Sequence, residues 1–152
     1  MSEILAPNDL DIQLHEAFFE LGISEDQKAL ALELLQPLKE KDSIHSEHYY
    51  HSVRVGLLAK RSGSFMHLDA RALFFAGLFH DLGKVEIDKE LLGKADPWTD
   101  EDTEKIQEHV LTGYHLLKGK FDFSAEIILL HHRFQPNGYP KDLPPFLHDY
   151  SE

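Results

Sequence analysis

The side chains of this chain that could do chemistry begin with a histidine and an aspartate in direct succession, His80 and Asp81. They follow the apolar run of residues 70–79, so they lie at the inner end of the helix that this run predicts. A buried imidazole and carboxylate are costly to remove from water unless they are paired or bind a metal ion. Gly83 lets the backbone turn sharply here, and Lys84 can bring a cation back to the same place. A hydrogen-bonded structural pair and a metal site both agree with this segment taken alone.

Further imidazoles are predicted on three other helices. His51 follows Glu47 by one helical turn on the same face, His109 lies in the middle of a later helix, and His131 and His132 end another apolar run. Helical bundles build metal sites from side chains on facing helices. Imidazole and carboxylate ligands together suit Fe, Mn, Zn, Co or Ni, and an aspartate can bridge two such ions. The joint pattern therefore indicates a site for divalent transition metal, with two ions expected.

The helices that must position these residues are predicted from apolar spacing and capping residues. We expect helices at residues 14–21, 24–38, 47–61, 70–80, 100–118 and from about 122 to 132. Ser24 with Gln27, Asp69, and Thr99 with Asp102 are the expected N-terminal caps. No segment alternates polar and apolar residues over a strand's length, so we predict an all-α fold.

Helix ends and faces are predicted in the same way. We expect the second helix to bend or end near Pro37, and the third to end at Gly63 with Val53, Leu57 and Leu58 facing inward. The helix of residues 70–80 is apolar almost all round, which is typical of a central helix. Gly22 and Gly119 are expected to end helices, and Asp122 or Ser124 to cap the last one.

Composition limits the class of protein. The 152 residues suffice for one domain, 42% of them are hydrophobic, and no apolar run reaches the roughly 20 residues of a membrane helix. The chain has no cysteine, and its N-terminus lacks the basic start of a signal peptide, so we expect a cytoplasmic protein. With 15 basic and 27 acidic residues the net charge is −12, which disfavours nucleic acid polymers and anionic membranes as partners. A small phosphorylated substrate fits if bound metal ions reverse the local charge.

The ordered motifs resemble those of the HD superfamily of metal-dependent phosphohydrolases, most of all its HD-GYP branch. The resemblance runs from Glu47 to about Pro140. It rests on Glu47…His51, His80-Asp81-Leu82-Gly83-Lys84, Pro97…Thr99 leading to His109-Val-Leu-Thr-Gly113, His131-His132, and Asn137-Gly138-Tyr139-Pro140. It implies an HD-domain helical bundle for residues 41–152, with residues 1–40 as a helical segment that packs on it.

The resemblance also implies roles for individual residues. The metal ligands would be His51, His80, Asp81, His109, His131 and His132, with Asp81 bridging two ions and Glu47 able to hold a third. Lys84 would contact the substrate phosphate, and the loop containing Tyr139 would border the substrate cleft. Apart from the resemblance, Arg133 is a candidate second cation for the substrate phosphate. The implied reaction is hydrolysis of a phosphoester in a nucleotide or cyclic nucleotide by metal-activated water, with His109 or a neighbouring imidazole as the candidate to protonate the leaving group.

Two departures from the branch pattern keep alternatives open. Arg133 stands where an acidic residue usually follows the paired histidines, and the stretch from Arg133 to Asn137 is shorter than usual. The last ligand aspartate of the family has no clear match; Asp149 is a poor substitute, and we expect a further C-terminal helix to supply it. The alternatives are an HD-like sensor or interaction module without turnover and, third, a di-iron oxygenase. The sequence leaves the substrate, the metal and the oligomeric state open.

Overall fold

The computed structural model describes residues 7–41 and 47–142, and within these residues every regular element is helical. This confirms the predicted all-α fold class. In chain order the elements are α1 (Pro7–Glu20), α2 (Glu25–Lys41), α3 (Glu47–Phe65), α4 (Ala70–Phe79), the 3-10 helix η1 (Leu82–Glu86), α5 (Lys89–Leu92), α6 (Asp100–Gln107), α7 (His109–Leu117) and α8 (Asp122–Leu130). None of the described helices has the length and apolar character needed to cross a membrane.

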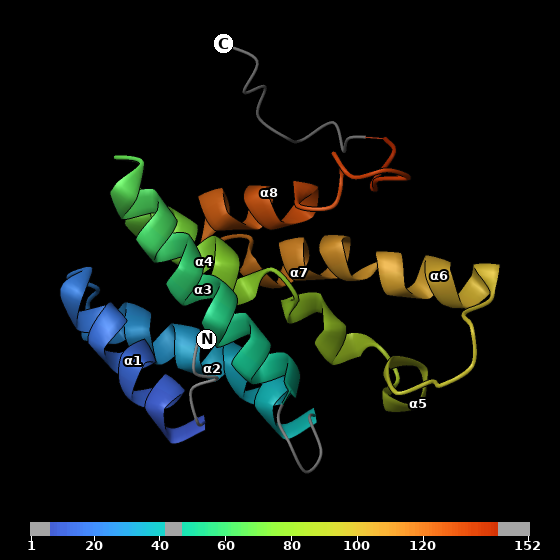
Figure 1. Ribbon diagram of the computed structural model, residues 1–152, viewed down its shortest axis with the longest axis horizontal. Helices are drawn as coiled ribbons and strands as arrows, with labels where there is room; N and C mark the ends of the chain where they lie inside the picture. The colour runs from blue at the N-terminus through green and yellow to red at the C-terminus, as the bar shows by residue number, and fades with distance from the viewer. Residues whose placement is uncertain (1–6, 42–46, 143–152) are drawn as a thin grey trace, which may run out of the picture.

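Helix α4 is the centre of the fold, as its all-round apolar sequence predicts. Residues 74–79 are all buried, and α4 packs against α3 on one side and α8 on the other (Figure 1). Its start is capped as expected, because the Asp69 side chain accepts a hydrogen bond from the backbone N–H of Ala72. The backbones of α3 and α4 approach so closely that a Cβ added to Gly77 would lie 2.8 Å from the carbonyl oxygen of Val55. This close approach fixes the end of α4, where the site begins.

The two N-terminal helices share the core of the rest of the chain. Leu14 and Phe18 of α1 and Leu35 of α2 belong to the same buried cluster as the aromatic residues of α4. The Phe18 ring meets the Phe74 ring edge-on, with 5.5 Å between ring centroids. Lys41 at the end of α2 donates a hydrogen bond to the carbonyl oxygen of Val85, 2.8 Å away, which ties α2 to η1 beside the site.

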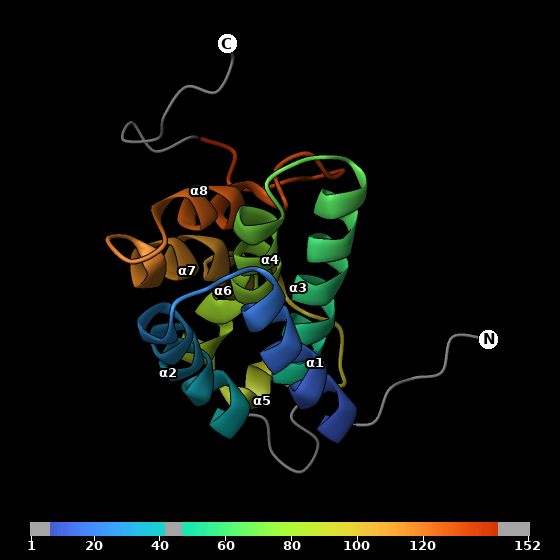
Figure 2. The same ribbon diagram turned by 90° about the vertical axis from the view of Figure 1, so that its left-hand side faces the viewer.

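Helices α7 and α8 lie side by side (Figures 1 and 2); α8 packs against α4, and α7 packs against η1. The predicted capping box of α6 is confirmed: Thr99 and Asp102 exchange side-chain to backbone hydrogen bonds of 3.1 and 3.0 Å. Gly119 ends α7 in the left-handed region, with φ of +83°. The cap predicted for α8 was wrong. Its N-cap is Phe121, and the Asp122 carboxylate accepts from the backbone N–H of Gly119 instead.

Two helices continue past residues that were expected to end them, for different reasons; the alternative that α2 bends near Pro37 stays a prediction. Helix α2 continues through Pro37 to Lys41; Pro37 and Glu33 are both exposed, so water can pair with the Glu33 carbonyl that the proline leaves unbonded. Helix α3 continues past Gly63, which is buried at the contact with α4, where an added Cβ would lie 2.9 Å from the Leu73 side chain. Gly63 is therefore a packing residue and not a helix end.

Two further expectations failed in the placement of side chains. Leu58, predicted to face inward, is 63% exposed on the outer side of α3. The single helix predicted for residues 100–118 is divided at Glu108, so His109 is the first residue of α7 and not a mid-helix residue. The His109 imidazole contacts the Ile106 carbonyl, which residue 110 would use in a continuous helix.

Candidate metal centre

Asp81 lies at the middle of a cluster of imidazoles, directly after α4 and before η1. Its side chain is buried, and its two oxygens face different histidines. Oδ1 is 3.4 Å from His109 Nε2 and 4.0 Å from His131 Nε2, whereas Oδ2 is 3.3 Å from His80 Nε2 and 3.9 Å from His51 Nε2. One carboxylate therefore stands between two sets of nitrogen ligands.

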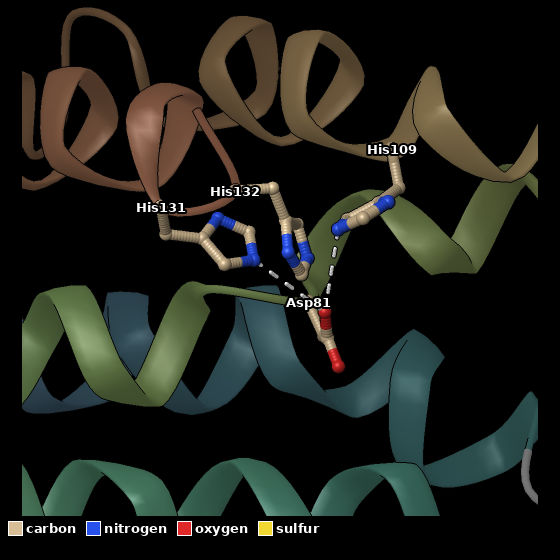
Figure 3. Close-up of side chains that lie close together, drawn as sticks. All are labelled: Asp81, His109, His131 and His132. Atoms are coloured by element: carbon tan, nitrogen blue, oxygen red, sulfur yellow. Dashed lines mark ion pairs between the residues drawn. The ribbon is translucent and has the colours of Figure 1, made fainter. Parts of the chain in front are cut away.

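We call these sets the inner group and the outer group. The inner group is His109, His131 and His132, whose side chains lie around Asp81 (Figure 3). His109 is the first residue of α7, and His131 and His132 directly follow α8. The outer group is His51 of α3 and His80 at the end of α4. In each group, one ligand atom per histidine and one Asp81 oxygen all lie within 4.8 Å of one another. The structure thus brings together six of the seven residues predicted as metal ligands.

Four of the five imidazoles are held at Nδ1 by an oxygen of the protein. His80 Nδ1 lies 2.7 Å from the Gly77 carbonyl, His109 Nδ1 2.6 Å from the Ile106 carbonyl, and His131 Nδ1 within hydrogen-bond distance of the Ile128 carbonyl. Each carbonyl is three residues earlier, in the last turn of a helix, where carbonyls have no partner within the helix. A carbonyl oxygen only accepts, so Nδ1 carries a proton, and in the neutral tautomer the lone pair lies on Nε2, the nitrogen that faces Asp81.

The fourth of these imidazoles uses a side chain that the sequence did not single out. His132 Nδ1 lies 3.0 Å from Oε1 of Gln135, three residues later in the turn that follows α8. The only sequence signal for this contact was the spacing of three residues between His132 and Gln135, which can bring two side chains together in a tight turn. It is too common a pattern to identify a partner without the structure.

The nitrogens of the inner group fit a metal ion. The Nε2 atoms of His109 and His131 are buried and make no hydrogen bond within the described structure. At 3.4 and 4.0 Å, their contacts with Asp81 are electrostatic rather than hydrogen bonds. Burial, with the nearby imidazoles of His132, His80 and His109, lowers the pKa of His131 to about 4, so its ring is neutral near pH 7. Buried imidazole nitrogens without a hydrogen-bond partner, beside a carboxylate, are ligands suited to a divalent transition metal.

The carboxylate of Asp81 is ionised for reasons that the structure makes plain. Burial raises its pKa, but the contacts with His109 and His80 and the charge of Lys84 together lower it far below the ordinary value. Lys84 Nζ lies 2.9 Å from Oδ2, on the side of the outer group. In that group the Nε2 atoms of His51 and His80 face one another at 3.2 Å, and two facing lone pairs require a proton or a cation between them.

Gly83 allows η1 to lie directly against α7. A Cβ added to Gly83 would stand 1.9 Å from the carbonyl oxygen of His109, a distance no side chain could occupy. The chain turns here from α4 into η1, as predicted, and it does so without a positive φ at Gly83. Its contribution is the close approach that brings Asp81 and His109 together.

The loop after α8 borders the inner group. The Tyr139 ring stacks on the His132 ring with 4.8 Å between centroids and an interplanar angle of 25°. Burial and the nearby charge of Asp81 raise the pKa of Tyr139 to about 12. The Arg133 guanidinium donates to the carbonyl oxygens of Pro140 and Lys141, so it holds this loop in place. Arg133, predicted to contact the substrate, is thus engaged with the backbone.

Two remaining candidates are not in the cluster. Glu47 is exposed at the start of α3, one turn before His51, and belongs to neither ligand group. Its role toward a third ion stays a prediction. Asp149, the poor substitute for the last ligand, lies outside the described residues.

Comparison with known proteins adds two findings. The family model of the HD domain matches residues 48–149. A cyclic di-GMP phosphodiesterase of Thermotoga maritima is 32% identical over 120 residues, which are 74% of this chain and 32% of that protein. The cyclic di-GMP phosphodiesterase response regulator RpfG of Xanthomonas campestris pv. campestris is 32% identical over 93 residues, 58% of this chain and 24% of that protein. The chain thus spans about a third of the length of the first relative and about a quarter of the second.

Proposed function

This chain belongs to the HD domain family, and from that premise we propose that it hydrolyses the phosphoester of a nucleotide or cyclic dinucleotide with the help of bound metal. The observation that carries the proposal is the placement of Asp81, whose two oxygens each face a separate group of imidazoles. A bridging carboxylate between two sets of nitrogen ligands is the arrangement that two-metal hydrolases need. The relatives, which are named for hydrolysis of cyclic di-GMP, favour a cyclic dinucleotide.

We propose that the inner and outer groups hold one divalent ion each, of Fe, Mn, Zn, Co or Ni. Such ions supply Lewis-acid activation of a phosphoryl group and of the attacking water. The protein supplies the ionised Asp81, shared by both groups, and imidazoles whose Nδ1 bonds keep Nε2 directed at the site. The net charge of −12 makes a small substrate, bound through the metal, more fitting than a nucleic acid polymer or a membrane.

The described contacts divide the predicted catalytic residues by role. His109 has its Nδ1 on the Ile106 carbonyl and its Nε2 toward Asp81, so we assign it to the metal and not to proton transfer. A nitrogen that binds a metal has no proton to donate. Lys84 is the cation nearest the site, and we propose that its ammonium stabilises charge on the phosphoryl oxygens once metal neutralises Asp81. Tyr139, stacked on His132, would form one wall of the substrate site.

The N-terminal helices are part of the same proposal. We propose that residues 1–40 are a helical addition that packs on an HD domain of residues 41–152. The family match begins at residue 48, while α1 and α2 contribute to the same buried cluster as α4. In this view α2 supports η1 through Lys41 and so supports the site.

One observation favours a second candidate, a metal-binding HD-like sensor without turnover. Lys84 is paired with Asp81, and Arg133 is bonded to backbone carbonyls, so both predicted phosphate-binding cations are engaged. A protein that binds metal and ligand without hydrolysis would retain this arrangement.

The experiment that tests the proposal measures metal content and hydrolysis together. Purified wild type, Asp81→Ala and the control Asp96→Ala, an exposed aspartate outside the cluster, are analysed by plasma mass spectrometry. Each is then incubated with cyclic di-GMP and with nucleoside monophosphates, and the products are separated by chromatography. We expect about two equivalents of a transition metal and turnover in wild type and control, and neither in Asp81→Ala.

The outcomes separate the candidates. Hydrolysis that continues after a chelator has removed all metal from the protein would refute the proposed reaction. Bound metal with no hydrolysis of any phosphoester would select the sensor. A wild type that takes up no metal would refute both.

A further inference from the structure

The first turn of α3, directly before the outer ligand His51, is tied to α1 by two tyrosines. The Tyr50 hydroxyl donates a hydrogen bond of 3.0 Å to Oδ2 of Asp11, and the Tyr49 hydroxyl donates a longer one of 3.4 Å to Oδ1. Asp11 lies near the start of α1. One carboxylate of the N-terminal segment therefore receives both hydroxyl groups of this turn.

The ring of His51 is held less firmly than those of the other ligands. The other four imidazoles each have Nδ1 against an oxygen of the protein, whereas His51 Nδ1 has no such partner in the described part of the chain. Its side chain is 55% exposed. The place of its Nε2, which lies 3.2 Å from Nε2 of His80, therefore depends on how the backbone of α3 is held.

Packing holds the middle of α3 better than its start. Val53 is fully buried, and Gly56 lies against Leu78 of α4. The end of a helix opens more readily than its middle, because the first N–H groups have no partner within the helix. The tie to Asp11 acts on this weaker end, immediately before His51.

Helices α1 and α3 run in the same direction and are joined near both ends. Besides the tie at Asp11, Glu20 at the end of α1 forms an ion pair with Lys60 of α3. Figure 2 shows the two helices next to one another. Lys60 follows His51 by nine residues, which is about 13 Å along a helix. The chain thus has two ties between the same helices, and only one of them lies beside the site.

Helix α2 holds the other side of the outer group. Lys41 donates to the Val85 carbonyl in η1, the segment that directly follows Asp81. Lys39 places its ammonium 4.9 Å from the centre of the Tyr49 ring. The two N-terminal helices therefore contact both the segment that carries His51 and the segment that follows the shared carboxylate.

We propose that Asp11 is a positioning residue for the outer metal site: it holds the hydroxyls of Tyr49 and Tyr50, fixes the first turn of α3 and so places His51. This inference rests on the proposed division of metal between the inner and outer groups. Asp11 lies outside residues 48–149, which match the family model, so the N-terminal segment supplies this contact. A change that displaces α1 would then lower metal affinity in the outer group and leave the inner group, carried by α7 and the end of α8, as it is.

Asp11→Ala and Glu20→Ala form a matched pair. Each removes a carboxylate through which α1 binds α3, but only Asp11 lies beside His51. Calorimetric titration of the metal-free protein with Zn²⁺ measures both binding steps. We expect Asp11→Ala to weaken the outer step by about three- to tenfold, less than the roughly 10- to 100-fold lost with a partner bonded to the ligand itself, and to leave the inner step unchanged. Glu20→Ala should leave both steps unchanged, and circular dichroism checks that both variants are folded.

Removing the hydroxyl groups tests whether Asp11 acts through the tyrosines. Tyr50→Phe loses the 3.0 Å bond and should weaken the outer step more than Tyr49→Phe, which loses the 3.4 Å bond. The two changes together should reproduce Asp11→Ala. Adding Asp11→Ala to this double variant should then cause no further loss, because the interaction is already absent.

The position of His51 can also be measured without metal. The rings of His51 and His80 meet edge-on with 5.1 Å between centroids, so their ring protons should give a nuclear Overhauser contact in the metal-free wild type. This contact should weaken in Asp11→Ala and persist in Glu20→Ala. The reading depends neither on bound metal nor on hydrolysis, so it separates this inference from the proposed function.

The results decide the inference in either direction. An outer step in Asp11→Ala equal to that of wild type would overturn it. An equal loss in Glu20→Ala, or an equal loss in both binding steps, would also overturn it, because the effect would then be a general loosening of the fold. A wild type that binds no ion in the outer group would overturn it as well. A selective loss of the outer step together with the ring contact supports it even if no phosphoester is hydrolysed, a result that would count against the proposed function alone.

Discussion

The inner and outer ligand groups share one carboxylate and yet are built differently. In the inner group His109 is 1% exposed, and each ring is held at Nδ1 by an oxygen of the protein. In the outer group His51 is 55% exposed in its side chain, and Lys84 places a positive charge against the same Asp81 oxygen. The inner group is thus prearranged and centred on a fully buried histidine, whereas the outer group is more open and has a cation already beside it.

This difference implies an order of metal affinity. Ligands that are already oriented lose little entropy on binding, and burial strengthens the attraction between metal and carboxylate. A neighbouring ammonium opposes a second cation. We therefore expect the inner group to bind its ion more tightly than the outer group, and the following changes test that expectation.

The largest effect is expected for His109→Ala. This ligand is buried at the centre of the inner group, so its loss should weaken the tighter ion by more than the roughly 10- to 100-fold lost when only a hydrogen-bond partner of a ligand is removed. Calorimetric titration with Zn²⁺ measures the two affinities, and circular dichroism checks the fold. Two unchanged binding steps would contradict the assignment of the inner group.

His51→Ala should produce a smaller and more selective loss. Because His51 belongs to the open group, we expect one binding step to disappear and the tighter step to remain. His115→Ala, an exposed histidine outside both groups, is the control and should retain both steps. Loss of the tight step in His51→Ala would reverse the proposed order of the two groups.

Gln135 offers a graded test of the inner group without removing a ligand. Gln135→Leu removes the oxygen that holds His132 Nδ1, and we expect affinity for the tight ion to fall by about 10- to 100-fold. Gln135→Glu, which retains an acceptor at the same place, should bind at least as tightly as wild type. Equal affinities in both variants would show that the contact does not position His132.

Lys84→Met should raise metal affinity instead of lowering it, and only in the outer group. Without the ammonium 2.9 Å from Asp81 Oδ2, the weaker ion should bind up to about tenfold more tightly, while hydrolysis falls under the proposed function. A weaker second ion in this variant would mean that Lys84 positions Asp81 instead of competing with the metal.

The smallest effect is expected at the start of α6, whose last turn holds His109 through the Ile106 carbonyl. Hydrogen bonds from Lys94 and the Thr99 backbone lower the pKa of Asp102 to about 2, from an ordinary value of 3.8. A carboxylate with a lowered folded-state pKa stabilises the fold above its unfolded pKa and loses this contribution as the pH falls through the folded value. Asp102→Asn should therefore lower the melting temperature slightly at pH 7, and the difference from wild type should vanish near pH 2. A difference in melting temperature between wild type and Asp102→Asn that grows as the pH falls would contradict the expected pH dependence.

Local sequence signals predicted the helices well where one residue type decides the outcome. Asp69 before an apolar run, and Thr99 three residues before Asp102, supply side-chain oxygens to free N–H groups at a helix start, and both caps are present. Helix ends were harder to predict. Gly63 and Pro37 have the usual character of helix terminators, but close packing in one case and solvent exposure in the other allow the helix to continue.

The sequence by itself determined which residues could form the site and the family to which the chain belongs. The types and order of the histidines and of Asp81 are given by the sequence without knowledge of the fold, and the family match agrees with them. The tertiary structure decided which oxygen of Asp81 faces which imidazole, and that Gln135 and three helix-end carbonyls hold the rings. It also decided that Arg133 holds a loop. The reason is physical: these contacts depend on how α4, α7 and α8 meet, and the distances between their ends arise from packing across the whole core.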